Sequence, residues 1–430
     1  MVSLSRVARC LSVLLISSCN VPEPPPSTGG ATFADGGANF TDSDANLVDV
    51  PGEVSTPRTC DRGVLVVASD FKSTNVVVSG LDGVTLSGSF VSSAAAKPGL
   101  TLALSGDVDV PYVAPRSRRA VILDRYGTNV ITWLNVDTAE PIGQLPIGQG
   151  FESNPHDYIE VDDTRAFVSR YGANLRPGAQ PFDEGGDLLI LDLRSRSIAG
   201  RIAMPEDDPR LLPCPAEMNW LGREVVVTLA RWSRDFAAVG EGRFVGVSPE
   251  TETVAWRVDV PGLDACGRVA VSPDGHYAAI ACSGRYDFDT KRYDTSRSDI
   301  VLFDATQRPP TELRRFRVAV QLDSSIQPTL VFASARALLG TAYGGNATVG
   351  DQAFALDIES GALTALVTSA KPFVLGGIRC SPGCGDICLL CDAAANRLRR
   401  WKATASGFEE LSSVVLESIV GLPPRTIGGI

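Results

Sequence analysis

Short apolar runs separated by turn residues recur along most of the chain. Runs such as "VLVVAS", "AVILDR", "DLLILDL", "EVVVTLA" and "DIVLFDA" are rich in β-branched and aliphatic residues and are bounded by turn residues. Segments of this length and composition predict β-strands, and few stretches show helical periodicity. The sequence therefore predicts an all-β fold.

These runs repeat with a period of about 54 residues. A strand ending in an acidic or hydroxyl turn recurs at spacings of 55, 56, 56 and 53 residues. The equivalent turn positions are Asp137, Asp192, Ser248, Asp304 and Asp357. Each is preceded by a second kind of strand, which gives about four strands per unit and predicts a β-propeller.

Counting the units predicts seven four-stranded blades, with six or eight as the alternatives. The units are Gly63–Val91, Val110–Gly148, His156–Met204, Ala216–Val260, Cys266–Val318, Thr329–Thr368 and Gly377–Val415. The first unit lacks an innermost strand. We expect the C-terminal segment Leu422–Ile430 to supply it, because a closed ring has no open sheet edge.

Three hairpins resemble a known repeat. "GRVAVSPDGHYAAIACSG" (Gly267–Gly284) is similar to the inner hairpin of YVTN-type propeller repeats, in which Ser-Pro-Asp-Gly joins two apolar strands. Asn154–Gly172 and Gly377–Ala393 are looser copies. The resemblance covers most of Gly63–Val415, and it implies the fold more strongly than any one function. It also permits a lactonase-like hydrolase.

The N-terminus resembles a bacterial lipoprotein signal. Arg6 and Arg9 precede an apolar run that is too short to span a bilayer, and the run ends in Ile16-Ser17-Ser18-Cys19. This lipobox-like end implies cleavage after residue 18, lipidation of Cys19 and membrane attachment in the cell envelope. Asn20 in place of Asp favours the outer membrane. An ordinary cleaved signal is the alternative.

The amino-acid composition predicts three segments in the chain, and the net charge argues against one class of partner. We expect a signal at residues 1–18, a flexible tether at 19–58 that is rich in Pro, Gly, Ser, Thr, Asp and Asn, and a propeller at 59–430. The net charge of −11 argues against a nucleic-acid partner. The remaining candidates are a protein, a peptide or a glycan.

Eight cysteines remain besides Cys10 and Cys19, an even number that suggests disulfides in an exported chain. A hairpin centred on the Pro273-Asp274-Gly275 turn pairs residues whose numbers sum to about 548, so Cys266 should face and bond Cys282. Four further cysteines, Cys380, Cys384, Cys388 and Cys391, lie in one hairpin. We expect them to form two local disulfides, one of them between Cys380 and Cys388 across the turn. A zinc site is the alternative. Cys60 and Cys214 have no assignable partner.

A cation–aromatic pair ends the second strand of several blades, next to the longest loops. In a propeller blade this end lies on the same face as the start of the innermost strand, where His156 lies. Arg and aromatic side chains carry binding energy at interfaces, although packing between blades is an equal alternative. The predicted binding face comprises Arg125, Tyr126, His156, Arg170, Tyr171, Arg231, Trp232, Arg285 and Tyr286.

Common catalytic motifs are absent from the sequence, and we expect no cofactor and no metal. His276 is expected to lie exposed after its turn. The acidic loop residues match no EF-hand pattern and are expected to be solvated. We therefore favour a binding protein over an enzyme. The alternative is a lactonase with a carboxylate-held metal, for which Asp157 and Asp264 are the only candidate ligands.

Overall fold

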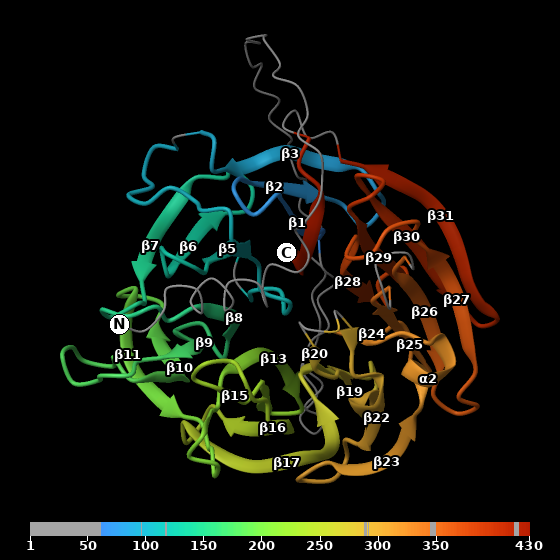
Figure 1. The fold of residues 1–430 in the computed structure, drawn as a ribbon. Coiled ribbons are helices and arrows are strands. Elements are labelled where there is room, and N and C mark those ends of the chain that lie inside the picture. The colour runs from blue at the N-terminus through green and yellow to red at the C-terminus, as the bar shows by residue number, and fades with distance from the viewer. Residues whose placement is uncertain are drawn as a thin grey trace, which may run out of the picture.

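The structure is a computed structural model that describes residues 62–430, apart from residues 96, 117, 288, 289, 291, 345–349 and 417–420. Seven four-stranded antiparallel sheets follow one another around a ring (Figure 1). The predicted seven-bladed, all-β propeller is therefore confirmed. Cys19, the signal segment and the tether lie outside the described residues.

Each blade is built from the axis outward. In blades 1 to 4 these strands are β32 (Pro424–Gly429), β1 (Val64–Ser69), β2 (Thr74–Ser79), β3 (Thr85–Ser92); β4 (Val108–Asp109), β5 (Arg119–Asp124), β6 (Val130–Asn135), β7 (Pro141–Pro146); β8 (Pro155–Glu160), β9 (Arg165–Ala173), β10 (Gly185–Asp192), β11 (Ser197–Ala203); and β13 (Pro215–Leu221), β14 (Glu224–Leu229), β16 (Glu241–Ser248), β17 (Thr253–Asp264).

In blades 5 to 7 the strands are β18 (Cys266–Val271), β19 (Tyr277–Ser283), β22 (Ser298–Asp304), β23 (Thr311–Phe316); β24 (Ile326–Phe332), β25 (Ala337–Ala342), β26 (Gln352–Asp357), β27 (Leu363–Thr368); and β28 (Leu375–Ser381), β29 (Ile387–Asp392), β30 (Arg397–Thr404), β31 (Gly407–Val415). Two small ribbons and two short helices lie in the loops: β12 (Leu211–Leu212) with β15 (Trp232–Ser233), β20 (Tyr286–Asp287) with β21 (Arg292–Tyr293), η1 (Thr295–Arg297) and α2 (Val318–Leu322). The described residues include no helix long and apolar enough to cross a membrane.

The C-terminal strand closes the ring. β32 pairs antiparallel with β1 and becomes the innermost strand of blade 1, as predicted from Leu422–Ile430. Figure 1 shows the first and last blades side by side at this closure. Backbone groups on the inner edge of β1 therefore pair with β32 instead of facing solvent.

Alternating side chains explain why inner strands such as β1 are almost wholly apolar. Val64 and Val66 of β1 pack into a cluster shared with blade 7, whereas Leu65 and Val67 pack into a cluster shared with blade 2. Successive strand residues point to opposite faces, and each face of a blade meets a neighbour. The same arrangement recurs at every junction between blades, which gives seven hydrophobic clusters.

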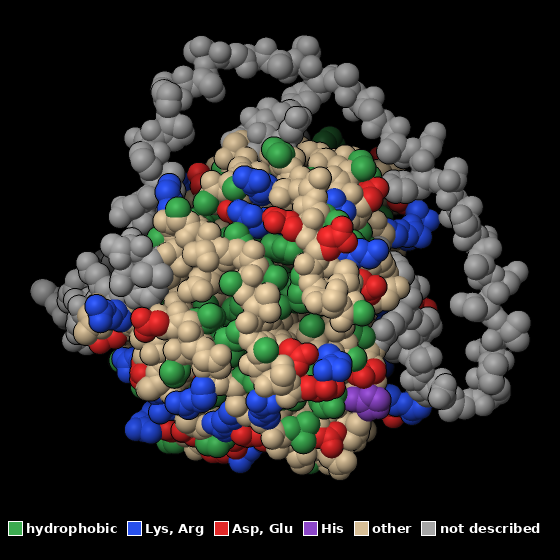
Figure 2. Space-filling view, turned by 90° about the vertical axis from the view of Figure 1, so that its right-hand side faces the viewer, with side chains coloured by type: hydrophobic (Ala, Val, Ile, Leu, Met, Phe, Trp, Pro, Cys, Tyr) green, Lys and Arg blue, Asp and Glu red, His purple; other side chains and the backbone are tan. Residues whose placement is uncertain are grey.

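The outer surface is of mixed polarity. Figure 2 shows acidic and basic side chains interspersed with hydrophobic ones on the side that it presents. Many of the cations belong to ion pairs, such as Arg118 with Asp137 at 3.0 Å. Exposed pairs of this kind contribute little to stability.

The Cys266–Cys282 disulfide is present, as predicted. Its register differs from the prediction in one respect. Partners elsewhere in the hairpin, such as Val269 and Ile280, sum to 549, and an irregularity between Cys266 and Val269 brings the two cysteines opposite each other. The turn begins at Ser272, and Gly275 adopts a positive φ of 73°, which favours glycine.

The hairpin of blade 7 holds one of the two expected local disulfides. Cys380 faces Cys388 across the strands and is bonded to it. Cys391 is instead a free, buried thiol, so the second local bridge is a correction to the prediction. Cys391 lies three residues beyond Cys388 and therefore points to the opposite face of β29, into the cluster shared with blade 1. Cys384 is disulfide-bonded, and Cys214 is free and buried.

Candidate binding face and axial site

The ring has one face where second strands end and innermost strands begin; we call it the loop face. Because strands in each blade run antiparallel, the loops after β5, β9, β14, β19 and β25 all leave from this side. Eight of the nine predicted site residues lie at these strand ends or in these loops, and the ninth, His156, lies at the start of the innermost strand β8. Their individual environments nevertheless differ sharply.

Arg125 and Tyr126 follow β5 on the loop face. The Arg125 guanidinium donates to Asp107 Oδ1 at 3.1 and 2.5 Å, and its Nη1 lies 3.5 Å from Asp109. Tyr126 projects outward and is 53% exposed. In this pair the cation is engaged within its own blade, and the aromatic ring is available at the surface.

Arg170 is buried, which corrects its assignment as a surface contact. Its side chain has no exposed area, and its Nε and Nη2 donate to the two oxygens of Asp187 at 2.8 and 2.7 Å. Asp187 is the cross-strand partner of Arg170, and the ring of Phe151 lies 5.2 Å from the guanidinium carbon. Arg170 therefore joins strands β9 and β10 rather than facing a ligand.

Tyr171 and His156 form a stacked pair near the axis. Their ring centroids are 4.4 Å apart with an interplanar angle of 18°. Both side chains are partly exposed, yet the His156 Nε2 atom is buried and has no hydrogen-bond partner in the described part of the chain. Burial and the nearby Arg125 guanidinium hold the pKa of His156 well below its ordinary value, so the imidazole is neutral at pH 7.

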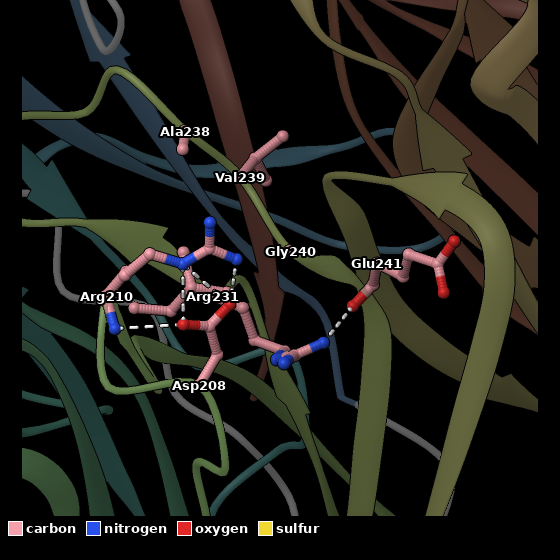
Figure 3. A pocket seen from close by; sticks show the side chains of 8 residues that line it. Asp208, Arg210, Arg231, Ala238, Val239, Gly240 and Glu241 are labelled. Atoms are coloured by element: carbon pink, nitrogen blue, oxygen red, sulfur yellow. Dashed lines mark hydrogen bonds and ion pairs between the residues drawn. The ribbon is translucent and has the colours of Figure 1, made fainter.

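Arg231 lines a pocket of about 350 Å³ in the loops of blade 4 (Figure 3). Its guanidinium makes two 2.7 Å hydrogen bonds to Glu206 and donates to the backbone oxygen of Glu241 at 2.8 Å. Arg210 and Asp208 pair across the pocket wall. The pocket is thus walled by cations that already have acidic partners.

Aromatic side chains form a row across blades 5 to 7. Arg285 is exposed and donates to the Ala237 carbonyl of blade 4 at 2.7 Å. Beyond it, partly exposed rings touch in sequence, with centroid separations of 5.0, 4.8 and 5.7 Å. The members of this aromatic row are Tyr286, Tyr293, Tyr343 and Phe373. Trp232 and Phe236 form a further ring pair in blade 4, with centroids 6.0 Å apart.

Charged residues surround the axis, and we call them the axial site; the sequence interpretation named Asp157 only as a candidate metal ligand and missed the others. The third residues of β8, β13 and β18 are Asp157, Glu217 and Arg268. Arg268 Nη2 lies 2.9 Å from Glu217 and 3.9 Å from Asp157. A charged residue at the same position of three consecutive innermost strands is a signal that could have revealed this site.

Tyr112 closes the axial site on the side away from the loop face. It lies in the loop that leaves the inner strand β4 at its far end, and its ring centroid is 4.0 Å from the Arg268 guanidinium and 4.9 Å from that of Arg379. Arg379 also donates to the Tyr112 carbonyl. These contacts span blades 2, 5 and 7.

Burial perturbs the acidic groups of the axial site. It raises the pKa of Asp157 to about 7, although Arg268 and the amide of Met218 oppose the shift. Burial also raises the pKa of Glu217 and of Asp109. A carboxyl group whose pKa is about 7, as that of Asp157 is, can hold or exchange a proton near neutral pH.

The residues proposed for a metal do not come together. Asp264 is ion-paired with Arg297 at the edge of blade 4, whereas the Asp157 carboxylate accepts from the backbone of Met218 in the next blade at 2.8 Å. Within the described ranges no group of three or more His, Cys, Asp or Glu residues could hold a metal ion. The Cys380–Cys388 bridge also removes two thiols from the zinc alternative.

Acidic residues of the loops mostly hold their own loops. Asp183 accepts hydrogen bonds from the backbone of Gly178, Ala179 and Gln180, and Asp294 caps η1 through Ser296. His276 is exposed, as predicted, and pairs with Asp274 at 3.1 Å on the opposite face of the ring.

No protein-family model matches the sequence, and no curated protein does so either. The fold is similar to solved propellers. A periplasmic gluconolactonase, PpgL, of Pseudomonas aeruginosa is 17% identical, with a TM-score of 0.52 and coverage of 85% of this chain and 98% of that one. A putative 6-phosphogluconolactonase of Bacteroides uniformis is 12% identical, with a TM-score of 0.54 and coverage of 86% and 100%.

A β-propeller domain of Cps50 (Swd1) from Myceliophteria thermophila is similar to the same degree. It is 11% identical, with a TM-score of 0.52 and coverage of 82% of this chain and 99% of that one. The similar structures thus include proteins named as lactonases and a propeller domain that is not so named. At these identities the likeness shows the fold alone.

Proposed function

We propose that this chain is an exported, lipid-anchored β-propeller that binds a partner through its loop face. The observation that carries the proposal is the gathering there of partly exposed aromatic side chains around an axis with an unpartnered, buried imidazole nitrogen. Aromatic side chains bury large contact areas at little entropic cost, and buried polar atoms without partners are rare. Both features suit a surface that a ligand covers.

The lipid anchor rests on the sequence Ile16-Ser17-Ser18-Cys19. Several acyl chains give lasting attachment, because each buried methylene contributes about 0.8 kcal/mol. The variant Cys19→Ala should release the protein from envelope membranes and abolish labelling by a fatty-acid probe. Unchanged labelling would refute the anchor and leave the binding face untouched.

The loop face is tested by capture of ligands from envelope extract on immobilised protein. The double variant Tyr126→Ala, Tyr286→Ala removes rings from two separate blades without touching a blade interior. A hot spot of about 2 kcal/mol would weaken capture roughly thirtyfold. The matched control is His276→Ala on the opposite face, which should capture as well as the wild type. Equal capture by all three proteins would contradict the proposal.

A lactonase is the second candidate, and the axial site gives it a specific basis. The neutral His156 imidazole and the raised pKa of Asp157, about 7 because of burial, suit proton transfer at neutral pH. One similar structure is named as a gluconolactonase and another as a putative 6-phosphogluconolactonase. Hydrolysis of glucono-1,5-lactone, with and without calcium, together with metal analysis, separates the two candidates. The binding role predicts no rate above buffer, whereas a rate abolished by His156→Phe would establish the enzyme.

A further inference from the structure

The positive charges of the axial site are already neutralised. Arg125 is held by Asp107 and Asp109, with its shortest contact at 2.5 Å. Arg268 is held by Glu217 at 2.9 Å and lies 3.9 Å from Asp157. With Arg379, which contacts Tyr112, the site holds three guanidinium groups and four carboxyl groups.

An anionic ligand would have to displace one of these carboxylates. Arg268 is also stacked on the Tyr112 ring on its remaining side, and Arg379 is engaged by the same tyrosine. Separating a partly buried guanidinium from its carboxylate is costly, because a charge is left without its partner. The site thus has no surplus positive charge to offer.

The unpartnered polar atoms are of mixed character. Among the described residues near the axis and the start of β8, His156 Nε2, Arg268 Nε, Glu217 Oε2 and Asn154 Oδ1 are buried and make no hydrogen bond. Arg268 Nε can only donate, the amide oxygen can only accept, and a neutral imidazole nitrogen does one or the other according to its tautomer. A hydroxyl group donates and accepts at once, so it can meet any of these atoms.

We propose that the axial site binds a neutral, polyhydroxylated ligand, a saccharide without carboxylate or phosphate groups. The inference rests on the proposed function, since it assumes that the loop face gives access to a ligand. It narrows the partner from protein, peptide or glycan to a neutral glycan end. In this proposal the ion-paired arginines orient the hydroxyl groups of the ligand by hydrogen bonding, and they do not attract an anionic ligand.

The first test uses matched sugars that differ only in charge. Glucose, galactose and mannose are compared with the corresponding uronic acids and 6-phosphates, by saturation-transfer NMR and titration on the full chain. At least one neutral sugar should bind about tenfold or more tightly than its acidic counterparts, a difference of one decade in the dissociation constant. Equal or tighter binding of an acidic counterpart overturns the inference, and so does the absence of binding across the set.

The second test changes the charge of the site. Glu217→Gln releases Arg268 from its carboxylate, so affinity for the uronic acid or the sugar phosphate should rise about tenfold. Asp137→Asn is the control, because it releases Arg118 from an exposed pair on the opposite face. If Glu217→Gln does not fold, Asp107→Asn releases Arg125 in its place. No gain in the folded axial variant, or an equal gain in the control, contradicts the inference.

These outcomes separate this inference from the proposed function. If envelope capture depends on Tyr126 and Tyr286 while the acidic sugars bind best, the loop face stands and the neutral-ligand assignment fails. If capture is unaffected by the loop-face variants, the proposed function itself fails.

Discussion

Two arginine–carboxylate pairs on the loop-face side of the ring have opposite surroundings. Arg170 and Asp187 have no exposed side-chain area and lie between the strands of blade 3. Arg268 and Glu217 lie at the axis, where their side chains are 12% and 30% exposed. The first pair joins neighbouring strands of one sheet, whereas the second joins two blades. Each arginine keeps one nitrogen without a hydrogen bond, Nη1 in Arg170 and Nε in Arg268. The presence of an arginine in the sequence therefore does not show whether it binds a ligand. Its ion-pair partner and the exposure of the pair must also be known.

The largest expected effect comes from breaking the buried pair. Arg170→Ala leaves Asp187 as a buried charge without its bidentate partner, which should lower the free energy of unfolding by about 3–5 kcal/mol. Chemical denaturation measures the loss. Arg118→Ala, in an exposed pair, is the control and should cost less than about 1 kcal/mol. A similar small loss for both variants would show that the buried pair is not structural.

The disulfide beside the axial arginine should have the next largest effect. Cys266 begins the strand that carries Arg268, and its bond to Cys282 closes a loop with a sequence separation of 16. Replacing both cysteines by Ser should cost about 3 kcal/mol under the chain-entropy model. Denaturation of the oxidised proteins measures this, and peptide mapping without reductant should find the two cysteines linked in the wild type. Free thiols at both positions would refute the bridge.

The Asp157 carboxyl should make stability depend on pH. Burial raises the pKa of Asp157 from 3.8 to about 7, so between these values the folded state binds more protons than the unfolded state. Stability should therefore fall as the pH rises through this window and level off above it. Arg268 and Glu217 face the same group and also influence it.

Asp157→Asn replaces the carboxyl group with an amide that does not titrate, so this contribution to the pH dependence of stability is lost. Between pH 5 and 8 the variant should lose less stability than the wild type, by on the order of 2 kcal/mol. Denaturation curves at the two pH values measure the difference. An identical pH dependence in both proteins would show that Asp157 is already ionised at pH 5.

The smallest expected effect concerns the floor of the axial site. Tyr112→Leu keeps an apolar side chain but removes the aromatic face that both Arg268 and Arg379 contact. The expected loss is about 1 kcal/mol, since partly shielded cation–π contacts lie in that range. Thermal unfolding measures it. A loss as large as that of Arg170→Ala would place the axial arginines among the structural residues.

The fold was predictable because its main signal is local and repeated. Apolar runs at a constant period specify blades, and a missing strand at one end with a spare strand at the other specifies the closure by Pro424–Gly429. The Cys266–Cys282 pair followed from the turn that joins their strands. The irregularity between Cys266 and Val269 was not predictable. It shifts the strand register by one residue, and only the packing of the sheet determines where such a shift occurs.

For the candidate site residues, the sequence predicted the surface position of the aromatic side chains better than that of the arginines. Tyr126, Tyr171, Trp232 and Tyr286 all reach the loop face at least in part, as expected for strand-end residues. The position of a neighbouring arginine depends on its ion-pair partner in another strand or loop. Arg170 pairs with Asp187, and Arg231 pairs with Glu206. The axial residues come from different blades and meet only when the ring closes, so no single stretch of sequence contains the site.

The most direct test of the claim that the axis is a ligand site is His156→Phe. This change keeps a flat ring to stack on Tyr171 and removes only the ring nitrogens, including the unpartnered Nε2. Melting temperature and capture from envelope extract are measured on the same protein sample. The account predicts a nearly unchanged melting temperature with capture reduced about tenfold or more. Capture that stays at the wild-type level in a fully folded variant would contradict it.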